Sequence, residues 1–213
     1  MLRLRLVVAS LSSLRHVAAL STAPLPRAPE QLHLPAGTLH PAACAVDDLM
    51  RECEVRHTKG SGPGGQHRNK VQTAVVVTHT PTSLVGSASE SRSQQANMGK
   101  AIFRLRVRLA LKCRTASPLD ADADASLLEP SALWASRAKS GKIAVNANHV
   151  DFPAVLAEAL DTIWEARDVK MAAEALGVSS SQITKLLAKE PAALSQVNAF
   201  RASFGLPGLR ANK

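Results

Sequence analysis

Residues 60–70, GSGPGGQHRNK, are the segment that most constrains how this chain can fold. Four glycines surround Pro63, and glycine permits backbone conformations and close approaches that a Cβ atom would block. An unbroken polar and basic run, Gln66 to Lys70, follows them, and a hydrophobic core cannot accommodate such a run. We therefore expect an exposed loop, presented by the elements on either side of it.

The segments that flank this loop favour β-structure. Residues 53–58, CEVRHT, predict one strand, and the β-branched residues of 71–80, VQTAVVVTHT, predict a second. Alternation along the second strand would place on one face Val71, Thr73, Val75 and Val77. Pro81-Thr82-Ser83 predicts a turn, after which 84–89 can pair back as a hairpin. A short helix is expected to start at Asp47 or Asp48, because acidic residues suit the first turn.

A long helix is predicted to begin near Ser91, which with Gln94 matches a capping box. Its apolar face would consist of Met98, Ile102, Leu105 and Leu109. A separate basic stripe would consist of Lys100, Arg104, Arg108 and Lys112. Such a stripe can simply be a solvated face, but like charges four residues apart repel one another. We therefore expect this stripe to contact phosphates.

The net charge of +9 is concentrated in the middle of the chain. Residues 51–114 hold twelve Lys and Arg residues against three Glu residues, so this segment alone carries +9. Such a field indicates a polyanionic partner, nucleic acid before membrane. Aromatic residues make up only 3% of the chain, which argues against a platform for stacking single-stranded nucleic acid.

The glycines also contain a literal GxGxxG at Gly60, Gly62 and Gly65. A dinucleotide site needs a helix directly after this pattern, whereas β-branched residues follow it here. A Walker lysine is missing as well, because Gln66 stands after Gly65. Nucleotide binding is therefore disfavoured, and a plain glycine-rich hairpin turn is the simpler alternative on the loop alone.

A longer sequence pattern argues against a plain hairpin turn. The run Gly62-Pro63-Gly64-Gly65-Gln66-His67, continued by Asn69-Lys70 and Ala74-Val75, resembles the catalytic domain of class I peptide chain release factors. The likeness continues through Thr78-His79, Pro81-Thr82, Glu90 to Gln94, Asn97 and Lys100-Ala101. It covers residues 53–114 in the order and spacing of that family.

The resemblance implies a ribosome-dependent peptidyl-tRNA hydrolase with the catalytic residues Gly64, Gly65 and Gln66. In the family this loop reaches the peptidyl-transferase centre, where the Gln backbone N–H stabilises developing charge. The expected partners are ribosomal RNA and peptidyl-tRNA. No metal, cofactor or membrane is expected, and the protein is expected to be a monomer. His67 is a weaker candidate for a general base than for an RNA contact, and the expected RNA-binding residues are His67, Arg68, Lys70, Arg92, Lys100, Arg104, Arg108 and Lys112.

The chain also departs from the full-length family pattern. The sequence before the loop is too short for the domain that reads stop codons, which favours a rescue-type factor acting on stalled ribosomes. Rescue factors typically end in a basic tail, whereas SFGLPGLRANK carries only Arg210 and Lys213. Met98 stands where the family often has a basic residue. A ribosome- or RNA-binding module without release activity is the alternative to the hydrolase.

The N-terminal residues predict an organellar address. Residues 1–29 contain four Arg residues in a Leu-, Ala- and Ser-rich stretch, with no acidic residue before Glu30. This composition is typical of a transit peptide, for a mitochondrion or, as the alternative, a plastid. The three cysteines, which form no CxxC pair or zinc-like cluster, suit a reducing compartment and read as small hydrophobic residues: Cys44, Cys53 and Cys113.

The C-terminal part is predicted to be helical. Residues 151–165 form one amphipathic segment, and in 168–189 Gly177 separates two helical runs in a pattern similar to a helix-turn-helix. Three roles are open for this segment: it simply packs its own core, it docks on the ribosome or another partner, or it binds DNA. DNA readout is disfavoured because few basic residues are available there.

The predicted fold class is α+β: a small antiparallel sheet packed on a long helix, followed by a helical C-terminal unit. The expected divisions are a transit peptide at 1–29, a linker at 30–46, the hydrolase domain at 47–114, a second linker at 115–145 and the helical region at 146–213.

Overall fold

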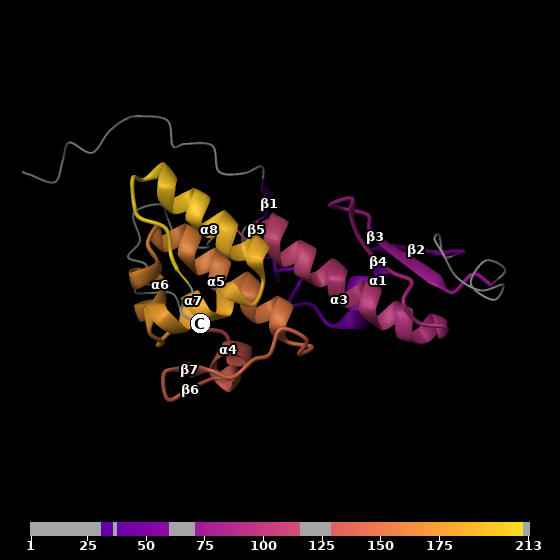
Figure 1. Ribbon diagram of the computed structural model, residues 1–213, viewed down its shortest axis with the longest axis horizontal. Helices are drawn as coiled ribbons and strands as arrows, with labels where there is room; N and C mark the ends of the chain where they lie inside the picture. The colour runs from indigo at the N-terminus through magenta and orange to yellow at the C-terminus, as the bar shows by residue number, and fades with distance from the viewer. Residues whose placement is uncertain (1–30, 36–37, 60–70, 116–128, 211–213) are drawn as a thin grey trace, which may run out of the picture.

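The computed structural model describes residues 31–35, 38–59, 71–115 and 129–210 (Figure 1). The transit peptide expected at 1–29 and the loop at 60–70 lie outside these ranges. Within them, no helix has the length and apolar character needed to cross a membrane.

Three antiparallel strands form the sheet, in the order β2-β3-β4. They are β2 (Cys53–Thr58), β3 (Ala74–His79) and β4 (Leu84–Ala88). Val77 of the central strand lies opposite Val55 on one side and Gly86 on the other. The three predicted strands are confirmed, except that the second begins at Ala74 rather than at 71. The preceding residues turn locally, because the Thr73 N–H donates to the Val71 carbonyl at 3.0 Å.

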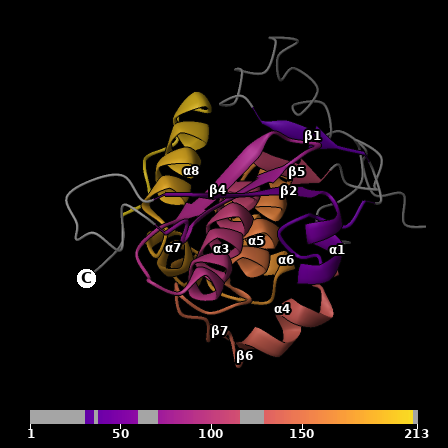
Figure 2. The same cartoon turned by 90° about the vertical axis from the view of Figure 1, so that its right-hand side faces the viewer.

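The long helix α3 (Gln94–Lys112) packs against β3 and β4. Figure 2 looks from the sheet side and shows β2 and β4 lying across α3, with α5 behind it. Leu105 and Leu109 are fully buried, whereas Met98 and Ile102 of the predicted apolar face are only partly buried. Ala101, also fully buried, completes the row. The short helix α1 (Val46–Arg51) precedes β2, close to its predicted start.

The predicted capping box at the start of α3 was wrong. Ser93, not Ser91, is the N-cap, and its hydroxyl accepts the Ala96 N–H at 3.3 Å. The Gln94 side chain turns away from the helix backbone and reaches β2, as described below. A Ser-rich entry offers several caps at neighbouring positions, and packing against the sheet selects among them.

Gly86 allows β4 to lie directly on α3. A Cβ atom at this position would overlap the Ala101 carbonyl oxygen and would lie 2.6 Å from the Leu105 nitrogen. Both obstacles are helix backbone, which cannot move aside like a flexible side chain. The close contact between sheet and helix therefore depends on glycine here.

The C-terminal half of α3 also packs against the helical unit. It packs on α5 (Phe152–Ala166), which also contacts α4 (Ala132–Arg137), α6 (Val169–Ala175) and α7 (Ser180–Ala188); α8 (Pro191–Ser203) packs on α7. The segment expected to be simply amphipathic is buried around most of α5, because neighbours cover several of its faces. Gly177, at φ 64°, separates α6 from α7 as predicted.

Two regions expected to be linkers contain regular structure. In the first, β1 (Leu32–Leu34) pairs in parallel with β5 (Cys113–Thr115) directly after α3. In the second, α4 leads into a two-stranded hairpin of β6 (Ala138–Lys139) and β7 (Lys142–Ile143). Both strand pairs are too short to produce a periodic sequence pattern, so they were not predicted.

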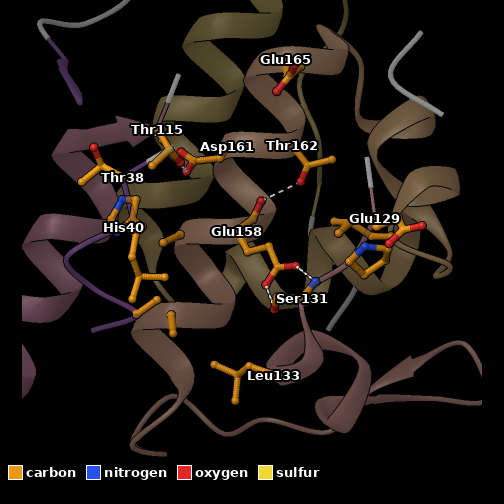
Figure 3. A pocket seen from close by; sticks show the side chains of 16 residues that line it. Thr38, His40, Thr115, Glu129, Ser131, Leu133, Glu158, Asp161, Thr162 and Glu165 are labelled. Carbon is orange, nitrogen blue, oxygen red and sulfur yellow. Dashed lines mark hydrogen bonds between the residues drawn. The ribbon is translucent and has the colours of Figure 1, made fainter. Parts of the chain in front are cut away.

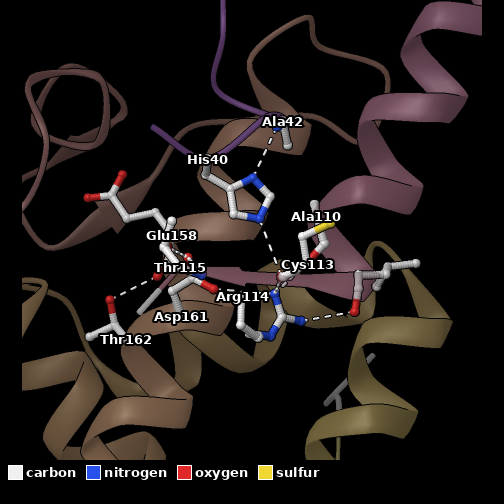
Figure 4. Close-up of polar contacts among 10 residues, drawn as sticks. His40, Ala42, Ala110, Cys113, Arg114, Thr115, Glu158, Asp161 and Thr162 are labelled. Carbon is white, nitrogen blue, oxygen red and sulfur yellow. Dashed lines mark hydrogen bonds and ion pairs between the residues drawn. The ribbon is translucent and has the colours of Figure 1, made fainter. Parts of the chain in front are cut away.

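Buried polar contacts join the N-terminal segment to β5, and β5 to α5 (Figure 4). The His40 ring accepts the Ala42 N–H at Nδ1 (3.0 Å) and donates from Nε2 to the Cys113 carbonyl (3.3 Å). This arrangement needs a neutral ring, and burial lowers the pKa of His40 accordingly. Arg114, 2% exposed, pairs with Asp161 of α5 at 3.3 Å.

Replacing Gly86 by Ala should lower the free energy of unfolding by about 1–3 kcal/mol, because the added methyl group pushes β4 away from α3. Gly99→Ala is the matched control. Nothing lies within 4 Å of a Cβ at that helical position, and Ala favours a helix over Gly by about 1 kcal/mol. Urea unfolding should show that Gly86→Ala is less stable than the wild type and that Gly99→Ala is more stable. A Gly86→Ala protein as stable as the wild type would contradict the close contact.

Candidate functional site

The strands β2 and β3 bring together the two ends of the glycine-rich segment. Thr58, the last residue of β2, lies opposite Ala74, the first residue of β3. The structure thus describes the residues on which the loop is mounted. The loop residues predicted for catalysis and RNA contact lie outside the described part: Gly64, Gly65, Gln66, His67, Arg68 and Lys70.

The first turn of α3 holds both of these ends. On the β2 side, the Gln94 side-chain amide donates to His57 Nδ1 at 2.6 Å. On the β3 side, the Asn97 side-chain amide donates to the Thr73 carbonyl at 2.7 Å. Two side chains one helical turn apart therefore fix the approach of the chain to the loop from either direction.

Asn97 is the stronger of these two anchors, because it is fully buried and uses its whole amide. Its oxygen accepts the Ser91 N–H at 2.8 Å, and its nitrogen donates to the Ser91 carbonyl at 2.8 Å besides that of Thr73. A buried amide satisfied on both atoms locks the backbone segments that it joins. Sequence reasoning included Asn97 only as part of the family pattern and missed this role. A polar residue in the helical row Asn97, Ala101, Leu105 and Leu109 was the available signal.

All four residues of the predicted basic stripe are exposed along α3. Lys112 lies twelve positions after Lys100 on the helix, so the stripe is about 18 Å long. Arg92, also exposed, lies just before the start of this helix. The structure therefore brings together the predicted cationic residues that it describes.

The two central cations of the stripe also serve the fold. Arg104 donates to the Ser87 carbonyl at 2.7 Å and pairs with Glu90 at 2.6 Å, while Arg108 donates to the Val85 carbonyl. Both carbonyls belong to β4, whose outer edge pairs with no other strand in the described ranges. The arginines satisfy an edge that is otherwise open. The hydrogen bond from Arg104 lowers the pKa of the Glu90 carboxyl. Within the described residues, Lys100 and Lys112 form no ion pair.

Arg106 is a cation that sequence reasoning missed. It lies two residues past Arg104, off the exposed stripe, and it is only 7% exposed. Its guanidinium donates to the Ala42 carbonyl from two nitrogens, at 3.0 and 2.7 Å, and to the Val150 carbonyl at 3.3 Å. A basic residue out of phase with a basic stripe is the signal that separates this structural cation from the others.

The N-terminal segment and the helical unit together line a separate pocket of about 580 Å³ (Figure 3). Two of its carboxylates have partners in the protein: Ser131 donates to Glu158 from its N–H (2.7 Å) and its hydroxyl (2.6 Å), and Thr115 and Arg114 contact Asp161. Burial raises the pKa of Glu158. None of the residues that line this pocket is a loop end or an α3 residue, so it is distinct from the candidate site.

The cysteines are unsuited to nucleophilic chemistry. Burial raises the pKa of the Cys113 thiol to about 11, and it also raises the pKa values of Cys44 and Cys53. Such thiols stay protonated at neutral pH. Among the described residues, no group of three or more His, Cys, Asp and Glu side chains could hold a metal ion.

Asn97→Ala should lower the free energy of unfolding by about 2–4 kcal/mol, because it removes a buried amide and leaves the half-buried Ser91 N–H and Thr73 carbonyl without partners. Gln95→Ala, two positions away on the exposed side of the same helix, should change it by less than about 0.5 kcal/mol. Chemical denaturation of both variants measures the difference. Equal stabilities would show that the loop ends are held by other contacts.

Comparison with known proteins agrees with this layout. The RF-1 domain family model matches residues 46–141, from the start of α1 through the turn of the β6–β7 hairpin. Peptide chain release factor 1 of Acidiphilium cryptum (strain JF-5) is 42% identical over 86 residues, which are 39% of this chain and 24% of that protein. Peptide chain release factor 1 of Paracidovorax citrulli (strain AAC00-1) is 37% identical over 100 residues, 47% of this chain and 24% of that protein.

A plant relative matches in the same way. Peptide chain release factor PrfB1, chloroplastic, of Arabidopsis thaliana is 39% identical over 67 residues, 32% of this chain and 15% of that protein. The chain thus spans about a quarter or less of the length of these relatives. The family match ends at the hairpin turn, before β7 and α5, so it covers the sheet, α3, α4 and β6. This sequence match over residues 46–141 and the α+β fold support membership of the class I peptide chain release factor family.

Proposed function

We propose that this protein hydrolyses the ester bond of peptidyl-tRNA on the ribosome, with Gly64, Gly65 and Gln66 as its catalytic residues. One observation carries the proposal: Gly-Gly-Gln lies between two strand ends that Gln94 and Asn97 hold on α3. Fixing both ends limits the directions in which the segment between them can extend. Positioning of this kind supplies much of the rate in enzymes that do little covalent chemistry.

The proposed reaction needs no residue that acts as a nucleophile. A water oxygen attacks the ester carbonyl carbon, and the bond to the terminal ribose oxygen of the tRNA breaks. The peptide gains a carboxyl group, and the leaving oxygen takes up a proton, so that the tRNA regains its hydroxyl group. The Gln66 backbone N–H stabilises the negative charge that develops on oxygen, and its side chain helps to admit the water. The ribosomal RNA and the tRNA supply the remaining groups.

The exposed cations around the loop fit ribosomal RNA as the surface on which the protein binds. We propose phosphate or RNA contacts from His67, Arg68, Lys70, Arg92, Lys100, Arg104, Arg108 and Lys112. Lys100 and Lys112 have no ion-pair partner in the described structure, so they are the stronger candidates on α3. Arg104 and Arg108 can add a phosphate while they hold β4, because a guanidinium has five N–H donors.

The setting that we propose is rescue of stalled ribosomes in an organelle, by a monomer. Arg-rich residues 1–29 and the chloroplastic relative support an organelle; we favour the mitochondrion, with the plastid as the alternative. The proposed divisions are a hydrolase domain at 47–114 and a helical region at 146–213. α3 packs on the latter, so removal of the helical region would uncover the far half of α3.

Gly65→Ala and Gln66→Ala should each reduce peptide release by at least about 100-fold while ribosome binding persists. The first change restricts the backbone, and the second removes the side chain that helps to admit water. Release of a labelled peptide from ribosomes that hold peptidyl-tRNA measures the effect, and Gln95→Ala is the control for loss of a glutamine. Undiminished release by both loop variants would refute the catalytic assignment. Ribosome binding without release by the wild type would favour the binding module.

The same assay separates rescue from ordinary termination. Ribosomes carrying a truncated mRNA should support release as well as ribosomes stopped at a stop codon. Activity confined to stop codons would exclude the rescue role and leave hydrolysis itself intact.

A further inference from the structure

The β6–β7 hairpin presents two lysines side by side. Ser140 and Gly141 both have positive φ, 51° and 71°, which is the backbone of a tight two-residue hairpin turn. This turn places Lys139 directly opposite Lys142, and both side chains are exposed. Like charges in this position destabilise a strand pair. An anionic partner that binds both lysines would remove this repulsion and so stabilise the short hairpin.

One face of α7 continues this positive surface. Gln182, Lys185 and Lys189 are spaced three and four residues apart, so they share one side of the helix. The Gln182 side chain accepts the Ile143 N–H at 3.4 Å, and the Lys189 ammonium donates to the Val145 carbonyl. The chain that leaves the hairpin thus runs along this side of α7, and exposed Lys185 lies between the two contacts. We call Lys139, Lys142 and Lys185 the lysine surface.

The lysine surface is positive although the unit that carries it is almost neutral. Residues 129–210 contain nine Lys and Arg and eight Asp and Glu residues. Four of the carboxylates, Glu129, Glu158, Asp161 and Glu165, gather instead around the pocket of Figure 3. Among the described residues, none of the three lysines forms an ion pair. Although Arg137 and Arg201 pair with carboxylates of the unit, the three lysines therefore keep their positive charge at a distance from the carboxylates of the pocket.

We propose that the lysine surface binds the phosphate backbone of RNA, as a second anchor beyond the α3 stripe. Lysine binds phosphate as a point charge on a flexible stem, so it does not need a fixed directional partner. Base stacking is disfavoured, because the described aromatic side chains of the unit are buried or packed on one another, as Trp134, Phe152 and the Trp164–Phe200 stack are. The inference rests on the proposed function in taking this RNA to be ribosomal.

The test is the salt dependence of binding of the full chain to ribosomes. Each phosphate contact contributes about 0.9 to the slope of log affinity against log salt concentration. Replacing the three lysines by Gln should therefore lower the slope by about 2 to 3 and the affinity by more than about tenfold. The triple Lys→Arg variant should keep both values. Lys170→Gln, at an exposed lysine of α6 outside the surface, is the control and should change neither.

Two further measurements make the outcome decisive. A naked RNA duplex of about 20 base pairs should lose affinity for the triple Gln variant in parallel with the ribosome; loss on the ribosome alone would assign the surface to a ribosomal protein and overturn the proposal. An unchanged slope would overturn it as well. Peptide release at saturating protein should be unaffected by the three changes, so a wild type that binds but releases no peptide would refute the proposed hydrolysis and leave the lysine surface standing.

Discussion

The burial of one face of α3 is the interaction on which the rest of the structure depends. Ala101, Leu105 and Leu109 are fully buried, and each leucine contributes roughly 1.5–3 kcal/mol of hydrophobic stabilisation. The sheet packs on this helix at one end and α5 packs on it at the other. Asn97 and Gln94 on its first turn hold the two ends of the glycine-rich loop. A single rigid element therefore carries the loop and joins it to the helical unit.

Charge on α3 is divided by helical phase. Arginines that face outward satisfy the open edge of β4, whereas Arg106 turns inward and joins carbonyls of two other segments. Within three positions of the chain, arginine thus occupies both an exposed position at the sheet edge and a buried structural position. This sharing explains how a helix so rich in cations remains a packed element.

Most of the release factor domain could be predicted from the sequence, because local signals agree with the tertiary structure there. β-Branched residues specified β3, and the Pro-Thr-Ser turn specified its pairing with β4. The N-cap of α3 was predicted at Ser91, two residues before the observed Ser93. Several neighbouring serines can cap the helix, and contact with β2 selects one of them. The β1–β5 pair was missed because it joins residues some 80 positions apart through three residues each. The anchoring by Asn97 depends on the same long-range packing, so the sequence pattern included the residue without its role.

The most direct test of this account is the single-turnover rate of peptide release by Asn97→Ala, compared with wild type and Gln95→Ala at a temperature where all three are folded. If α3 positions the loop, Asn97→Ala should bind ribosomes with wild-type affinity and release peptide at least about tenfold more slowly, since small misplacements of reacting groups reduce rates strongly. Release by folded Asn97→Ala at the wild-type rate would contradict the claim that this helix sets the direction of the loop.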